Sequence, residues 1–182
     1  MKISFVTTNR GKYNEISRMI QQRGHEAEQL PTPYPEVQVE SLEIVVLQGL
    51  YWLMQHYERP ILVDDSGLFV DSLNGFPGVY SAHAYKSFGC DGILRLMETE
   101  TNRKARFECV LGFMDIGKDP MLFKGVSEGS ISTETRGEKG FGFDPIFVPE
   151  GFSETFAEMP MDRKNELSHR GRAFEKLFEF LG

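Results

Sequence analysis

The hydrophobic pattern at the start of the chain changes its period once, at a short polar stretch. Residues 3–7 form a β-prone run, and Thr8-Asn9-Arg10-Gly11 ends it. Apolar side chains then recur at helical spacing, at positions 13, 16, 19 and 20. The pattern predicts a strand, a turn and a helix. Free amide groups at the start of such a helix attract anions, and Lys12 adds a positive charge nearby.

A proline-rich stretch and a second helical stripe follow. Residues 31–39 contain three prolines, which exclude a helix, although residues 36–40 are compatible with an extended chain. A helix is predicted from Glu40, and Pro60 lies beyond its end as a stop signal. Its apolar stripe consists of Leu42, Val45, Val46, Gly49, Leu50 and Leu53.

The middle of the chain begins with the continuous apolar run Ile61-Leu62-Val63. This run is typical of a buried strand, and the polar and small residues at 64–67 predict a turn directly after it. Residues 73–80 are rich in turn formers, and residues 91–98 predict a short helix with Ile93, Leu94 and Met97 inward.

The remainder of the chain is first strand-rich and then helical. Residues 105–116 and 121–131 favour strands and predict a long antiparallel hairpin. A glycine-rich stretch follows at 137–144, and the chain ends on a predicted amphipathic helix with Leu167, Phe174, Leu177, Phe178 and Leu181 on one face. These elements predict one α/β domain over residues 1–182, with a mixed, strongly twisted sheet.

Composition narrows the range of functions. The chain has 182 residues, of which 40% are hydrophobic, so it can bury an ordinary core. Its net charge of −7 disfavours a nucleic-acid partner, because proteins that bind a polynucleotide usually have a positively charged surface. Cys90 and Cys109 lack the spacing of a zinc site or a disulfide framework. No leader or membrane-length run is visible, so we expect a cytoplasmic protein without a membrane partner.

Two adjacent carboxylates, Asp64 and Asp65, are the most unusual candidates for chemistry. Alternate side chains of a strand point to opposite faces, so only one of the two is expected to face a given site. The other is free to cap a turn. Carboxylates and phosphate oxygens are hard ligands suited to Mg²⁺, and Glu36, Glu40 and Asp65 are able to supply them. For Glu40, a favourable interaction with the helix dipole is an equally good explanation.

Two further segments carry chemically useful side chains. Phe141-Gly142-Phe143-Asp144 combines aromatic faces and an acceptor, which suits either a purine base or a β-turn with core aromatics. Residues 164–170 bring together the side chains of Lys164, Ser168, His169 and Arg170, which suits either a binding site or an exposed helix start.

Taken together and in order, five segments resemble the inosine/xanthosine triphosphate pyrophosphatase family, also called the Ham1 family. The resemblance covers nearly the whole chain. The segments are Thr7-Thr8-Asn9-Arg10-Gly11-Lys12, Asp64-Asp65-Ser66-Gly67-Leu68, residues 75–82, Phe141-Gly142-Phe143-Asp144-Pro145, and residues 156–160 followed by Lys164-Asn165 and Ser168-His169-Arg170.

The resemblance implies an elongated α/β fold with a cleft between two lobes, of the Maf/Ham1 type. It implies Mg²⁺-dependent hydrolysis of non-standard purine nucleoside triphosphates (ITP, dITP and XTP) to the monophosphate and pyrophosphate. The implied role is cleansing of the nucleotide pool, and members of the family are typically homodimers.

Residue roles follow from the same resemblance. Asp65 is expected to act on the attacking water, and Glu36 and Asp65 are the expected metal ligands. The expected substrate-binding residues are Thr7, Thr8, Asn9, Arg10, Gly11, Lys12, Ser66, Phe141, Gly142, Phe143, Asp144, Lys164, His169 and Arg170. Whether Asp65 serves chiefly as a base or as a metal ligand is left open at this point.

Two other functions compete with this hypothesis. Phosphatases of the haloacid-dehalogenase type also place aspartates after a hydrophobic strand. Their two aspartates are separated by one intervening residue, whereas Asp64 and Asp65 are directly adjacent. An aspartyl-phosphate mechanism is therefore disfavoured. A non-catalytic purine-nucleotide sensor would use the same pocket, because binding groups and catalytic groups overlap.

Overall fold

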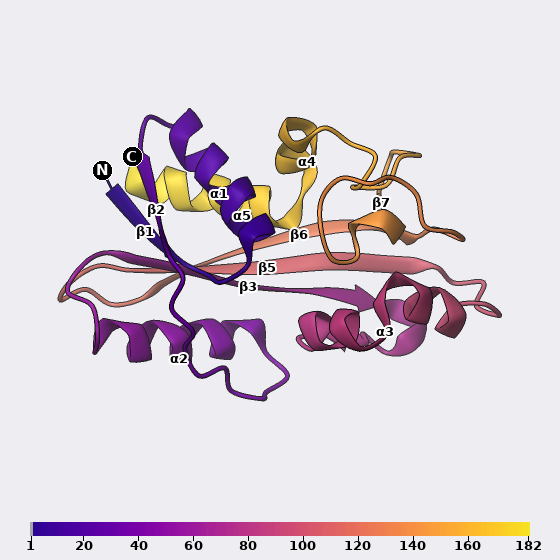
Figure 1. The fold of residues 1–182 in the computed structure, drawn as a ribbon, viewed down its shortest axis with the longest axis horizontal. Helices are drawn as coiled ribbons and strands as arrows, with labels where there is room; N and C mark the ends of the chain where they lie inside the picture. Colours follow the sequence, from indigo (N-terminus) through magenta and orange to yellow (C-terminus); the bar gives the residue numbers. More distant parts are fainter. Residues whose placement is uncertain (1) are drawn as a thin grey trace.

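One seven-stranded sheet forms the centre of the protein, as the computed structural model of residues 2–182 shows (Figure 1). The strand order is β2-β1-β3-β5-β6-β7, and β4 pairs with β3 beside this row. The first three strands of the row are parallel, and the others pair in antiparallel fashion. The sheet is therefore mixed, as predicted. The bounds are β1 Lys2–Val6, β2 Glu26–Leu30, β3 Ile61–Val70, β4 Pro77–Gly78, β5 Lys104–Met114, β6 Met121–Ile131 and β7 Phe147–Pro149.

Five α-helices lie against this sheet. Helices α1, α4 and α5 lie on one side of it, and α2 and α3 on the other (Figure 1). No helix of residues 2–182 is long and apolar enough to cross a membrane. The bounds are α1 Arg10–Gln22, α2 Leu42–Met54, α3 Ser81–Leu96, α4 Met161–Leu167 and α5 His169–Leu181, with short 3₁₀ helices at Asp71–Leu73 and Asp144–Ile146.

The core is divided by the sheet, and β3 contributes to both sides. Leu62 belongs to the cluster under α1 and α5, together with Ile16 and Phe174. The next residue, Val63, belongs to the cluster under α2. This alternation continues along the strand. It sends Asp64 toward α1 and α5 and Asp65 toward the α2 side, so the two adjacent carboxylates face opposite ways, as predicted.

The predicted turn at residues 64–67 is wrong. β3 continues without a break to Val70, and Asp64 and Asp65 pair with Leu111 and Val110 of β5. The long strand β5 offers backbone partners over this whole length, so the polar residues remain in the ladder. The burial of Asp64 is compensated by ion pairs with Lys12 and Arg170, and Asp65 accepts a hydrogen bond from the Ser66 amide; a hydrophobicity pattern reveals neither.

Other boundaries also differ from the prediction. α3 begins at Ser81 instead of residue 91, and Gly89, with φ of 62°, interrupts its regular geometry. Leu167 ends α4 instead of joining the last helix, because Ser168 is extended and caps α5 through a hydrogen bond from the Gly171 amide. The edge strands β2 and β7 were not predicted, since β2 is largely polar and β7 has only three residues.

Two predictions are confirmed closely. Strands β5 and β6 form the long antiparallel hairpin. Helix α2 begins after the N-cap Ser41 and buries the predicted stripe in full: Leu42, Val45, Val46, Gly49, Leu50 and Leu53. In both elements the apolar positions in the sequence are those that pack against the rest of the protein. A sequence pattern predicts structure well when local and tertiary preferences agree in this way.

Ser81 fixes the start of α3 against β3, and its removal should destabilise the fold. Its buried hydroxyl accepts a hydrogen bond from the Leu68 amide at 2.8 Å and donates one to the Gly78 carbonyl at 2.7 Å. Ser81→Ala leaves a buried amide unsatisfied, so we expect a loss of about 1–3 kcal/mol in the free energy of unfolding. Urea denaturation measures it. The matched control is Ser87→Ala on the exposed face of α3, which should change stability by less than about 0.5 kcal/mol; equal losses in both variants would contradict the role of Ser81.

Candidate active site

A cavity of about 830 Å³ opens beside the middle of β3. Its walls come from the β1–α1 turn, the proline-rich segment before α2, the start of α3, the 141–144 segment and the start of α5. The predicted site residues that line it are Thr7, Thr8, Asn9, Lys12, Glu36, Asp65, Ser66, Phe141, Gly142, Phe143, Asp144, His169 and Arg170. Segments far apart in the sequence therefore meet at one cavity.

The β1–α1 turn is held by its own polar side chains. The Asn9 side chain caps α1 by accepting a hydrogen bond from the Lys12 amide at 3.1 Å, and Thr7 Oγ1 accepts one from the Asn9 amide. Gly11 packs under Phe141, where a Cβ atom would come within 2.5 Å of the ring. Arg10 is exposed and is not part of the lining. The turn therefore presents a helix N-terminus and Lys12 to the cavity.

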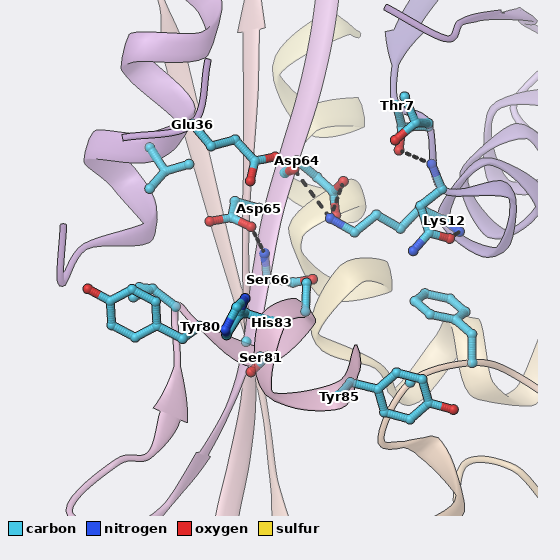
Figure 2. A pocket seen from close by; sticks show the side chains of 18 of the residues that line it. Thr7, Lys12, Glu36, Asp64, Asp65, Ser66, Tyr80, Ser81, His83 and Tyr85 are labelled. Atoms are coloured by element: carbon cyan, nitrogen blue, oxygen red, sulfur yellow. Dashed lines mark hydrogen bonds and ion pairs between the residues drawn. The ribbon is translucent and has the colours of Figure 1, made fainter. Parts of the chain in front are cut away.

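Asp64 begins a chain of buried ion pairs. Lys12 Nζ forms an ion pair with Asp64 Oδ1 at a distance of 3.1 Å, and Figure 2 draws this pair as a dashed line. The other carboxylate oxygen of Asp64 accepts hydrogen bonds from Arg170 Nε and Nη2, each at 3.1 Å. Arg170 Nη2 also donates to Ser66 Oγ at 3.0 Å. Both carboxylate oxygens of Asp64 are therefore paired with cations.

The chain continues from Arg170 through the interior. Arg170 Nη1 donates to Glu15 Oε2 at 2.7 Å, and the other oxygen of Glu15 accepts from Lys164 Nζ. Lys164 Nζ also donates to Asp144, which accepts a hydrogen bond from the Phe141 amide at 2.8 Å. The complete set is Lys12, Asp64, Arg170, Glu15, Lys164 and Asp144, and we call it the buried ion-pair chain. Three cations alternate with three carboxylates, so it is close to neutral.

Mutual attraction keeps Asp64, Glu15 and Lys164 of this chain ionised despite burial, whereas burial raises the pKa of Asp144. Burial alone would raise the pKa of Asp64 and of Glu15, but Arg170 with Lys12 or Lys164 lowers both below their usual values. Burial likewise opposes the charge of Lys164, and the carboxylates of Asp144 and Glu15 outweigh it and raise its pKa. Asp64, Glu15 and Lys164 therefore carry charge at neutral pH.

Asp65 is in the opposite electrostatic situation. Burial raises its pKa to about 6, the charges of Asp64 and Glu36 act in the same direction, and Lys12 offsets only part of the effect. Asp65 Oδ1 accepts a hydrogen bond from the Ser66 amide at 2.9 Å. A carboxylate with this pKa can exchange a proton near neutral pH, which suits a general base.

Glu36 and Asp65 also provide the donor set of a Mg²⁺ site. Both carboxylates line the cavity, and Figure 2 shows them on the same side of it. Among residues 2–182, no group of three or more His, Cys, Asp or Glu side chains is arranged to hold a metal. Mg²⁺ normally uses one or two carboxylates together with waters and substrate phosphates, so two fit its requirements.

Of the two aromatic residues in the 141–144 segment, one packs mainly in the core and the other faces the cavity. Phe143 is buried and contacts Tyr85 edge-on, with 5.3 Å between ring centroids. Phe141 lines the cavity, and Lys164 Nζ and Arg170 Cζ lie 4.9 and 5.5 Å from its ring centroid. The alternative of core aromatics therefore describes Phe143, whereas Phe141 offers a ring face near two cations.

Residues 164–170 are not an exposed helix start. His169 is buried and stacks on Phe107, with 4.6 Å between ring centroids. Burial, together with the charges of Arg170 and Lys164, lowers its pKa well below the usual value, so the imidazole is neutral. Among the described residues its Nδ1 has no hydrogen-bond partner. Lys164 lies behind the cavity wall and not in the lining.

Sequence reasoning missed two members of the buried ion-pair chain as functional residues. Glu15 lies on the buried face of α1 with Ile16 and Met19, and an acidic residue on an apolar face was the available signal. Asp64 was treated as one of two equivalent acids. Its role depends on Arg170, which is 106 positions away. Residues 80–86 also line the cavity, with the exception of Ala84.

The fold and site together describe an α/β domain with a cleft whose lining includes acidic and basic side chains. Comparison with known proteins gives the family: the Ham1 family model matches residues 3–180, and this chain belongs to that family. A protein of Thermococcus kodakarensis named dITP/XTP pyrophosphatase is 49% identical over 181 residues, covering 100% of this chain and 97% of that protein. The protein of the same name from Pyrococcus horikoshii is 50% identical with the same coverage.

Solved structures agree with this assignment. A HAM1 protein from Coxiella burnetii superposes with a TM-score of 0.86 at 29% identity, covering 100% of this chain and 98% of that one. The Staphylococcus aureus Ham1 protein gives a TM-score of 0.85 at 28% identity, with the same coverage. The predicted family and fold class are therefore confirmed.

Removal of Glu15 should expose how strongly the buried ion-pair chain depends on complete pairing. Glu15→Ala leaves three buried cations with two carboxylates, so one positive charge is uncompensated and we expect a loss of about 3–5 kcal/mol in unfolding free energy at pH 7. The pKa of Glu15 is lowered in the folded state, so its contribution is complete above the unfolded pKa of about 4.3 and is lost at lower pH.

The control for this prediction is an exposed ion pair. Glu175 pairs with Arg23 at the surface, and Glu175→Ala should cost no more than about 1 kcal/mol. Denaturation curves at pH 7 and pH 4 measure both variants. A Glu15→Ala loss as small as that of the control would contradict the dependence on complete pairing.

Proposed function

We propose that this protein is a Mg²⁺-dependent nucleoside-triphosphate pyrophosphatase. It would hydrolyse ITP, dITP and XTP between the α- and β-phosphates, releasing the monophosphate and pyrophosphate. The names of the archaeal relatives support this reaction. The observation that carries it is Asp65, a carboxylate with pKa raised to about 6 that faces the cavity beside Glu36 and Lys12. Removal of the deaminated purines from the nucleotide pool is the proposed role.

In this mechanism Asp65 accepts a proton from the water that attacks the α-phosphorus. Its pKa of about 6 leaves it ionised at neutral pH and still basic enough to take the proton. The α1 N-terminus and Lys12 bind phosphate oxygens through amide groups and charge. Phosphoryl transfer depends mainly on positioning and charge stabilisation, which these groups provide.

Glu36 and Asp65 would hold Mg²⁺. When bound, the ion neutralises charge on the phosphate oxygens. The excess negative charge that raises the pKa of Asp65 also favours a cation at this point, because Glu36 and Asp64 both contribute to it. Asp65 is therefore proposed to serve both as a metal ligand and as a general base. Titration of its carboxyl group with and without Mg²⁺ distinguishes the two roles.

The purine base would stack on Phe141. The neutral His169, with its unpaired Nδ1, and the guanidinium of Arg170 lie in the same part of the cavity. Hypoxanthine and xanthine carry an acceptor at position 6, whereas adenine carries a donor, so donors at this end discriminate against adenine. A polar site rejects a mismatched donor because both groups are left unpaired, at a cost of about 1–3 kcal/mol.

We further propose that the enzyme is a homodimer that acts in the cytoplasm. The resemblance of the five ordered segments to the family supports the dimer. The cytoplasm is proposed because it contains the nucleotide pool on which the reaction would act.

Product analysis tests the proposal directly. Purified protein with Mg²⁺ should convert ITP and XTP to the monophosphate and pyrophosphate, and should act at least tenfold more slowly on ATP, since a mismatch of about 1.4 kcal/mol corresponds to that factor. Anion-exchange chromatography and a pyrophosphate-specific assay measure the products. Release of orthophosphate from the triphosphate would contradict α,β cleavage.

The variant that tests the role of Asp65 is Asp65→Asn, which preserves the shape of the side chain and removes its basicity. It should bind ITP and lose most of its turnover. If wild-type protein also binds ITP but forms no product, the sensor function replaces the enzymatic one.

The titration of Asp65 provides a separate prediction. In metal-free protein, ¹³C NMR of labelled aspartate should show a carboxyl group with pKa of about 6, because burial and the neighbouring carboxylates disfavour its charged form. Addition of Mg²⁺ should lower this pKa, because a cation favours the carboxylate. Asp65→Asn identifies the signal. An Asp65 pKa near 4 without metal, or one that Mg²⁺ leaves unchanged, would remove the electrostatic argument for its role.

A further inference from the structure

Three of the expected substrate-binding cations, Lys12, Lys164 and Arg170, are largely neutralised by carboxylates within the protein. Lys12 and Arg170 both pair with Asp64, and Arg170 also pairs with Glu15. Lys164 lies between Glu15 and Asp144. A triphosphate brings several negative charges into a cavity that also contains Glu36 and Asp65. The buried ion-pair chain alone does not balance that charge.

Helix α3 carries a cation of a different kind. Among the charged residues that line the cavity, the basic ones are Lys12, Lys86 and Arg170. Lys86 makes no ion pair with any residue of the described chain, 2–182, and its side chain is exposed. An exposed lysine without a carboxylate partner keeps its full charge available for a ligand. Of these three basic residues, Lys86 is therefore the one whose charge is not paired with a carboxylate of residues 2–182.

The geometry of α3 directs this charge to the cavity. Ser81 and Ala84 are buried against the sheet, which turns Ala82, His83 and Lys86 toward the opening. Positions 82 and 86 are one helical turn apart and share a face. Figure 2 shows His83 on the α3 side of the cavity, across from Asp65 and Glu36. The first turn of α3 contains no acidic residue, so its positive end is not offset there.

We infer that Lys86, with His83 beside it, binds the polyphosphate chain of the substrate from the α3 side of the cavity. The β1–α1 turn would hold the same chain from the opposite wall. Lys86 is a flexible point charge, which suits phosphate oxygens that carry increasing charge as the α,β bond breaks. The inference deepens the proposed function and rests on it for the identity of the substrate.

The test compares a polyphosphate ligand with the product. Lys86→Met should weaken binding of Mg²⁺-tripolyphosphate about tenfold (about 1.4 kcal/mol) and should change IMP binding less than about twofold. Isothermal titration calorimetry measures both without turnover. Lys86→Arg keeps the charge and should restore tripolyphosphate binding. His83→Gln should produce a smaller loss in the same direction.

Lys118→Met is the matched control, because Lys118 is an exposed lysine in the β5–β6 turn, away from the cavity, and forms no ion pair within residues 2–182. It should leave both ligands unaffected. Unchanged tripolyphosphate binding in Lys86→Met would overturn the inference, and so would an equal loss for IMP. If ITP is not hydrolysed by wild-type protein, the proposed function fails; the binding comparison still decides the role of Lys86.

Discussion

The buried ion-pair chain is the constraint on which the rest of the site depends. It joins α1, β3, the 141–144 segment, α4 and α5 through six side chains, and paired members are up to 155 positions apart. Removing so many charges from water is costly, and such pairs often add little net stability. Their main effect here is positional: each charged group lies against its partners, which holds the elements that carry them together around the cavity.

The contrast between Asp64 and Asp65 follows from that constraint. The two residues are adjacent in one strand, yet strand geometry sends them to opposite faces. Asp64 meets Lys12 and Arg170, which lower its pKa and make it structural. Asp65 meets Glu36 and the charge of Asp64 itself, which add to the effect of burial and raise its pKa to about 6. The structural carboxylate therefore helps to raise the pKa of its neighbour.

The same arrangement separates two kinds of positive charge. Cations in the buried ion-pair chain fix the shape of the cavity and the position of Phe141, but their charge is matched by carboxylates. Lys86 on α3 contributes little to the core, and its charge is free. The interior charges of such a site are largely balanced without a ligand, and Lys86 on the exposed wall is left to attract the proposed anionic substrate.

The sequence by itself determined the α/β class, the β5–β6 hairpin, the stripe of α2 and the family, because each is encoded in local periodicity or in ordered short motifs. It also predicted a central catalytic role for Asp65. It predicted a turn at residues 64–67, since two aspartates interrupt an apolar run, and it gave no role to Glu15. Only the tertiary structure decided those points: whether a buried carboxylate is tolerated, and whether it is structural or reactive, depends on charges that come from distant segments and meet it only after folding.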